Sequence, residues 1–110
     1  MNIIEQYAAC KRSAPDALLL FRVGDFCELF DDDAEEAVRI LGLTLTVRRH
    51  QGQETPMAGF PRHSLDAYLA KLVRSGRRVA ICDPVDDPKD VASVGKREIT
   101  RTVVQGTLFD

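Results

Sequence analysis

The chain has 110 residues, of which 45% are hydrophobic and 29% are charged, and its formal net charge is -2. This length fits one domain, and the composition is that of a globular protein rather than a disordered one. The net charge excludes a general polycation that coats DNA through charge alone. No apolar run approaches the roughly 20 residues needed to cross a bilayer, and the N-terminus lacks a signal-peptide pattern. We therefore expect a cytoplasmic protein.

The first third of the chain predicts a helix followed by two strands. Apolar residues at helical spacing begin at Ile4, and residues 13–16 end that helix. Residues 17–23 are almost entirely apolar, which is typical of a central strand covered on both faces. A Gly-Asp turn at residues 24–25 then leads into a second strand over residues 26–30, which we expect to pair back with the first.

The middle of the chain predicts a second helix and a polar loop. The three aspartates at residues 31–33 favour a helix start, because carboxylates suit a helix N-terminus and can cap its free N–H groups. Gly42 ends this helix. Within residues 43–47, apolar residues alternate with threonines, and this pattern predicts a half-buried strand. We expect residues 48–56 to form a polar loop, and residues 57–61 to lead into the next helix.

The last third predicts one helix between strands. A helix that begins near Ser64 and ends at residues 75–76 has an apolar face at helical spacing. Residues 78–82 predict a short strand, residues 83–95 a loop and residues 97–104 a final strand. The predicted fold class is therefore α/β, a single domain with a mixed sheet of about five to six strands and about three helices.

The cysteines and histidines do not predict a metal site. Cys10, Cys27 and Cys82 are widely spaced and form no Cys-x-x-Cys pair, so we expect three free thiols. His50 and His63 have no second ligand at metal spacing. We predict no metal and no cofactor.

Phe26 and Glu28 are the first candidate functional residues. Period-two geometry puts both on one face of the strand and Cys27 on the other. A buried phenylalanine beside a buried glutamate would be costly unless the carboxylate were paired. Shared exposure near the turn is therefore favoured, and an exposed phenylalanine beside an acid suggests function. The plainer alternative is a core phenylalanine with a solvent-facing glutamate.

Four blocks in a fixed order carry a family resemblance, namely residues 18–37, 41–48, 56–82 and 96–108. Together they resemble domain I, the mismatch-recognition domain, of the MutS DNA mismatch-repair proteins. The resemblance covers residues 1–104 as the domain, with residues 105–110 as a C-terminal tail, and no block resembles the other MutS domains. It implies a stand-alone, ATP-independent DNA-binding module in the bacterial cytoplasm, associated with the nucleoid.

In this family a Phe-x-Glu triplet carries mismatch recognition, and that triplet falls on Phe26-Cys27-Glu28. The resemblance implies that Phe26 enters the DNA from the minor groove at mispaired or bulged sites, while Glu28 hydrogen-bonds the displaced base. Cys27 departs from the aromatic residue often found there, and we expect this to alter packing alone. The alternative is a retained scaffold that no longer distinguishes mismatches.

A second set of residues is expected to contact sugars and phosphates along the minor groove. By the same resemblance, arginines, a glycine that permits close approach and a helix start suit that task. The alternative for each residue is a solvated basic face. The set comprises Arg48, Arg49, Met57, Gly59, Pro61 and His63.

The C-terminal tail suggests a second function. Residues 105–109 resemble the Gln-x-x-Leu-Phe peptide with which bacterial replication and repair proteins bind the sliding clamp, with Gln105, Leu108 and Phe109 as anchors. This interpretation makes the protein an adaptor that joins the clamp or other mismatch-repair proteins. The alternative is an ancestral segment, because MutS proteins carry a similar Gly-Thr-Leu stretch there.

An enzyme is the third class of function and the weakest. Asp25, Glu28 and the aspartates at 31–33 have the carboxylates of a magnesium-dependent nuclease. However, no lysine follows Glu28 at the spacing of the common nuclease motif. The chain also lacks a glycine-rich phosphate loop with Lys-Ser/Thr. We therefore predict that the protein is not an enzyme.

Overall fold

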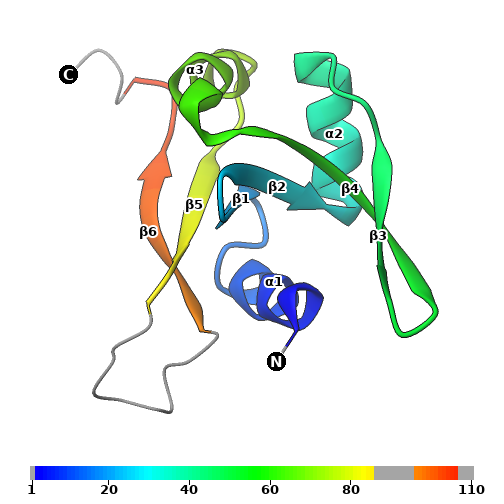
Figure 1. Ribbon diagram of the computed structural model, residues 1–110. Coiled ribbons are helices and arrows are strands. Elements are labelled where there is room, and N and C mark those ends of the chain that lie inside the picture. Colours follow the sequence, from blue (N-terminus) through cyan, green and yellow to red (C-terminus); the bar gives the residue numbers. More distant parts are fainter. Residues whose placement is uncertain (1, 86–95, 107–110) are drawn as a thin grey trace.

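A six-stranded mixed sheet with helices on both faces forms the domain (Figure 1). The computed structural model describes residues 2–85 and 96–106. The order of strands across the sheet is β3-β4-β2-β1-β5-β6. The strands are β1 (Leu18–Val23), β2 (Phe26–Phe30), β3 (Thr46–His50), β4 (Gln53–Pro61), β5 (Val79–Pro84) and β6 (Arg97–Val103). The helices are α1 (Ile3–Ser13), α2 (Asp31–Leu41), the short 3-10 turn η1 (Arg62–Ser64) and α3 (Leu65–Arg74). The predicted fold class is confirmed.

The central strand β1 explains why the domain has a core on each side of its sheet. Alternate side chains of a strand point to opposite faces. Leu18 and Leu20 accordingly pack with buried residues of α2 and α3, whereas Leu19 and Phe21 pack with Tyr7 of α1. β1 runs parallel to β5 and antiparallel to β2. The prediction of an apolar strand covered on both faces is confirmed.

A β-hairpin replaces the predicted loop at residues 48–56. β3 and β4 pair antiparallel through residues 46–57, and the turn between them is Gln51-Gly52, with φ of 49° and 80°. Positive φ at two successive residues gives a tight turn whose twist matches that of the strands it joins. The predicted strand at residues 43–47 is also shifted, because β3 begins at Thr46. Residues 57–61 belong to β4 and are not a loop.

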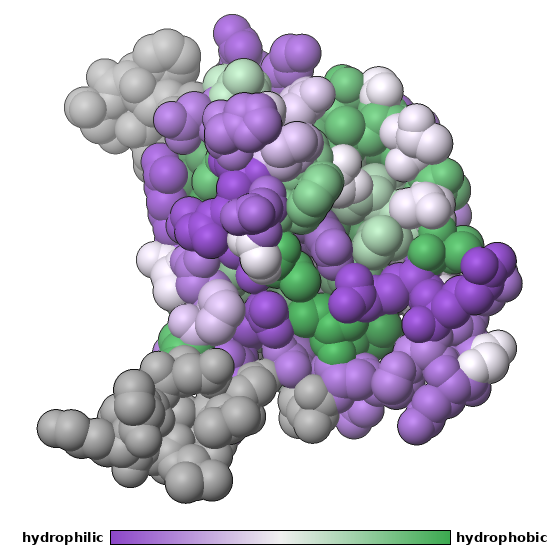
Figure 2. Space-filling model, in the orientation of Figure 1, coloured by the Kyte–Doolittle hydropathy of each residue, from purple (hydrophilic) through white to green (hydrophobic). Residues whose placement is uncertain are grey.

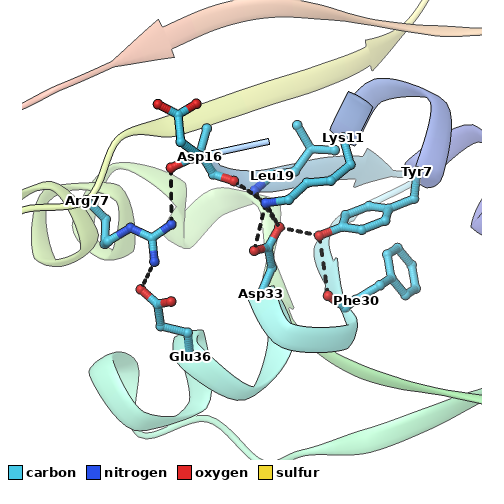
Figure 3. Close-up of polar contacts among 9 residues, drawn as sticks. Tyr7, Lys11, Asp16, Leu19, Phe30, Asp33, Glu36 and Arg77 are labelled. Atoms are coloured by element: carbon cyan, nitrogen blue, oxygen red, sulfur yellow. Dashed lines mark hydrogen bonds and ion pairs between the residues drawn. The ribbon is translucent and has the colours of Figure 1, made fainter. Parts of the chain in front are cut away.

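The buried carboxylate of Asp33, in the first turn of α2, anchors the start of this helix. Asp33 accepts hydrogen bonds from Lys11 Nζ at 2.9 and 3.0 Å, from the hydroxyl of Tyr7 and from the backbone N–H of Leu19 at 3.2 Å (Figure 3). The prediction that these aspartates cap the helix is not met in the expected way, because the N-cap residue is Phe30 and no side chain caps it. Asp33 instead joins α2 to α1 and β1.

The remaining predictions for the described residues concern thiols and the last loop. All three cysteines are free and buried. In the predicted loop over residues 83–95, residues 83 and 84 extend β5, and residues 86–95 lie outside the described residues. Leu108 and Phe109 of the tail also lie outside them. Within residues 2–85 and 96–106, no helix is long and apolar enough to cross a membrane, and no cluster of acidic, cysteine or histidine side chains forms a metal site.

Candidate nucleic-acid interface

Phe26 stands at the first position of β2, beside the tight turn that joins it to β1. Its partners across the sheet are Val23 on β1 and Pro61 on β4. The turn needs a residue with positive φ, which Gly24 supplies at 57°. The side chain of Phe26 is 49% exposed, whereas the phenylalanines at positions 21, 30 and 60 are buried. An exposed aromatic ring next to a rigid turn is therefore available for contact with a ligand.

Glu28 lies on the same face of β2 as Phe26, as predicted, and Cys27 is buried on the other face. The expectation that both side chains share exposure is wrong for Glu28, whose side chain is only 13% exposed. Its Oε1 accepts a hydrogen bond from the Arg48 guanidinium at 3.1 Å, which supplies the pairing that a buried carboxylate requires. Burial raises the pKa of Glu28, although Arg48 and Arg97 act in the opposite direction.

Gly59 makes room for Glu28 on the neighbouring strand. The two residues are direct partners in the β2–β4 ladder. A Cβ atom at position 59 would lie 2.9 Å from the carbonyl oxygen of Cys27 and 3.5 Å from Cγ of Glu28. Gly59 thus allows a close approach between β4 and β2, whereas its predicted close approach to DNA stays a prediction.

A shallow hollow opens between Phe26 and the β3–β4 hairpin. Its lining combines one carboxylate with apolar and hydroxyl groups, from Phe26, Glu28, Thr44, Thr46, Met57 and Gly59. The space-filling view shows hydrophobic surface in the middle of the face that it displays, bordered by hydrophilic residues (Figure 2). Leu45, just before β3, and Val47, within β3, are also exposed, but they alternate with Thr44 and Thr46 and therefore lie on the other face from this hollow. The hollow can receive a flat apolar group with a polar edge.

The structure brings together most, but not all, of the residues chosen from the sequence. Arg48 reaches Glu28 from β3, and Pro61 lies opposite Phe26. Arg49 is on the other face of β3, where it is 74% exposed and pairs with Glu54 at 2.9 Å. His63 is exposed in η1. Arg49 therefore does not join the hollow.

Sequence reasoning missed two features of this site. The threonines at positions 44 and 46 line the hollow. Their period-two spacing with Arg48 places all three residues on one face, and this spacing is the signal that could have identified the threonines. Arg62 ties η1 to the β1–β2 turn, because its backbone N–H donates to Asp25 O at 2.7 Å and its guanidinium to Gly24 O at 3.3 Å. No local pattern marks that contact, which joins residues far apart in the chain.

Comparison with known protein families shows the family to which the chain belongs. The family model described as MutS domain I matches residues 1–110. The chain belongs to the MutS domain I family. It is 51% identical over 110 residues to the DNA mismatch repair protein MutS of Methanothrix thermoacetophila, and 55% identical over 108 residues to that of Cytophaga hutchinsonii. These alignments cover 98% and 97% of the chain, but only 13% of each relative.

Membership of the MutS domain I family confirms the resemblance drawn from the sequence blocks. A third relative, the DNA mismatch repair protein MutS of Rhodopirellula baltica, is 54% identical over 98% of the chain and is matched over 12% of its own length. The chain thus spans about an eighth of these relatives. It corresponds to one MutS domain.

Proposed function

We propose that this MutS domain I binds double-stranded DNA and distinguishes mispaired or bulged sites by inserting Phe26 from the minor groove. The observation that carries the proposal is the exposed ring of Phe26 at the rim of a hollow whose lining includes Glu28. The relatives are named as DNA mismatch repair proteins, which supports DNA as the ligand.

The physical basis of discrimination is the cost of unstacking. A wedge that kinks the duplex must open one base step, which means separating two stacked base pairs. This separation costs less free energy where base pairing is already poor. Stacking of a base on an aromatic ring contributes about 1–3 kcal/mol and depends little on sequence. Because Phe26 is held by a tight turn and by pairing with both neighbouring strands, its ring meets the duplex with little loss of conformational freedom.

Glu28 would contact the base that Phe26 displaces. Burial raises the pKa of Glu28, so the side chain takes up a proton more readily than an exposed glutamate and can then donate a hydrogen bond to a base acceptor. On a fully paired duplex no base is displaced, so an ionised Glu28 gains no new partner and adds a negative charge, partly offset by Arg48, close to the phosphates. The same residue therefore favours a defect and disfavours ordinary DNA.

The residues around the hollow would position the duplex. Arg48 carries the charge for a phosphate contact, and Met57, Gly59 and Pro61 present a smooth strand surface. His63 lies just before α3, where backbone N–H groups favour an anion. Arg49, which pairs with Glu54 on the other face of the hairpin, contributes to binding only through longer-range charge.

A fluorescence titration tests this function. Duplexes that are identical except for one mismatch or one extra base are compared with the fully paired duplex at one stated salt concentration, because affinities for DNA depend on salt. The wild-type chain should bind the two defective duplexes more tightly, and Phe26→Ala should bind all three alike. Equal binding of all three by the wild-type chain would refute the proposal.

The sliding-clamp interpretation of the tail stays a separate prediction. Gln105 is exposed in a turn just after β6, so the segment begins at the surface. A pull-down with the sliding clamp, using the chain with and without residues 105–110, distinguishes the two outcomes. Capture that depends on those residues would support an adaptor role, and capture that is absent or independent of them would remove it.

A further inference from the structure

The ion pair between Glu28 and Arg48 joins a group that would contact a base to a group that would contact the backbone. The carboxylate is largely enclosed, whereas the Arg48 side chain is 35% exposed. Arg48 belongs to the edge strand β3, and its partial exposure leaves its side chain accessible from solvent. A duplex that enters the hollow would bring phosphates to this side chain.

A guanidinium donates to carboxylates and phosphates alike, and both are stronger partners than water. We propose that Arg48 exchanges partners: it pairs with Glu28 in the DNA-free domain and releases Glu28 when it binds a backbone phosphate. This inference rests on the proposed function, because it assigns a regulatory role within the same site. It makes Arg48 a positioning residue that acts on the displaced base through Glu28.

The exchange changes the chemistry of Glu28. After Arg48 leaves, the remaining cation near Glu28 among the described residues is Arg97, whose guanidinium lies 5.5 Å from the centre of the Phe21 ring. Phe21 is the cross-strand partner of Glu28, so this cation sits on the β1 side of the carboxylate. With less charge to stabilise the carboxylate, burial favours uptake of a proton from solvent. Glu28 then gains the O–H that it needs as a donor.

The exchange also explains how a paired duplex would be rejected. Breaking the ion pair costs free energy in every complex, but Glu28 regains a partner only when a base has been displaced. On ordinary DNA the phosphate contact of Arg48 is therefore offset by an unpartnered, enclosed Glu28. Arg48 thus adds to specificity as well as to affinity.

The first test needs no DNA and is independent of Phe26. The pKa of the Glu28 carboxyl group is measured by carbon-13 NMR in the wild-type chain, in Arg48→Gln and in Arg48→Lys. Arg49→Gln is the matched control, because Arg49 is the next residue of β3 but pairs with Glu54. The Glu28 pKa should rise in Arg48→Gln, return toward the wild-type value in Arg48→Lys and stay unchanged in the control. An unchanged pKa in Arg48→Gln, with the amide spectrum preserved, would overturn the inference.

The second test uses the fully paired duplex, where the proposed insertion of Phe26 plays no part. The loss of affinity caused by Arg48→Gln is measured in the wild-type chain and in Glu28→Gln. Without Glu28 as competitor, Arg48 is free to bind phosphate, so the loss should be about threefold to fivefold larger in the Glu28→Gln background, the range expected for an ion pair worth up to about 1 kcal/mol. Equal losses in the two backgrounds would refute partner exchange.

These outcomes are distinguishable from failure of the proposed function. If the wild-type chain binds defective and paired duplexes alike, mismatch discrimination fails, but the two Arg48 measurements still report on the exchange. If discrimination holds and both Arg48 measurements give the control result, the exchange is wrong, and specificity rests on Phe26 and Glu28 without a change of partner by Arg48.

Discussion

A Cβ atom on Gly59 would lie 2.9 Å from the carbonyl oxygen of Cys27, closer than the Cβ atoms of real side chains come to such an atom. Gly59→Ala should therefore push β4 away from β2 and disturb the floor of the hollow beside Glu28. We expect a loss of about 1–3 kcal/mol in the free energy of unfolding, as for other overpacked sites. For a domain of this size, each kcal/mol lowers Tm by roughly 4–8 °C.

Thermal unfolding followed by circular dichroism checks this prediction. Gln53→Ala is a suitable control, because Gln53 is exposed at the start of the same strand. Gly59→Ala with an unchanged Tm would show that the contact between β2 and β4 is looser than the structure indicates.

Asp33 should be one of the most important polar residues for stability. Asp33→Ala removes the acceptor for the Tyr7 hydroxyl, for the Leu19 N–H and for Lys11 (Figure 3). The buried Leu19 N–H would lose its acceptor and the buried Tyr7 hydroxyl would keep only Phe30 O, so we expect a loss of about 2–4 kcal/mol in urea unfolding from one unsatisfied donor and the lost bonds to a charged acceptor. Asp32→Ala is the matched control on the adjacent, exposed residue and should stay within about 0.5 kcal/mol. Similar losses in the two variants would contradict the role of Asp33.

Burial of Glu28 should make stability depend on pH in a defined direction. Because its pKa is raised in the folded chain, the folded state holds the proton to higher pH than the unfolded state does. Ionisation of Glu28 therefore lowers the free energy of unfolding as pH rises from the ordinary glutamate pKa through the folded-state value. The cost is fully present above that window and absent below it.

Glu28→Gln, which does not ionise, isolates this effect. The difference in free energy of unfolding between Glu28→Gln and the wild-type chain should shift in favour of the variant between about pH 3.5 and about pH 7, which bracket the ordinary glutamate pKa of about 4.3. Urea unfolding at several pH values gives this difference. A difference that stays constant over the range would mean that Arg48 fully offsets burial.

The sequence predicts the elements that have strong local patterns. The apolar run of β1, the period-two face shared by Phe26 and Glu28 and the helical spacing of α3 all appear as expected. The β3–β4 hairpin was missed because residues 48–56 are polar and mostly exposed, and its turn is Gln-Gly rather than the usual Asn-Gly.

The missed hairpin also hid the chemistry of the site. Without the hairpin, Arg48 has no reason to meet Glu28, twenty residues earlier in the chain. The same applies to Asp33, whose partners Lys11 and Tyr7 come from α1. A helix-start pattern explains the position of Asp33 but not its contacts, since contacts between distant segments follow from tertiary structure.

Exposure of Phe26 separates its role in binding from a role in folding. Because about half of its surface is accessible, Phe26→Ala should cost no more than about 1 kcal/mol of stability. Phe60→Ala should lower the free energy of unfolding by about 3–5 kcal/mol, because Phe60 is 1% exposed and packs against Tyr68. Chemical unfolding of both variants tests the contrast, and equal losses would place Phe26 in the core.

The most direct test of the account is whether the ring of Phe26 separates stacked bases. A fluorescent base analogue that brightens on unstacking, such as 2-aminopurine, is placed next to a mismatch and the chain is added to saturation. We predict a rise in fluorescence with the wild-type chain, little rise with Phe26→Ala, and little rise for either chain on the fully paired duplex. An equal rise with the wild-type chain and with Phe26→Ala, at matched occupancy, would contradict insertion by Phe26.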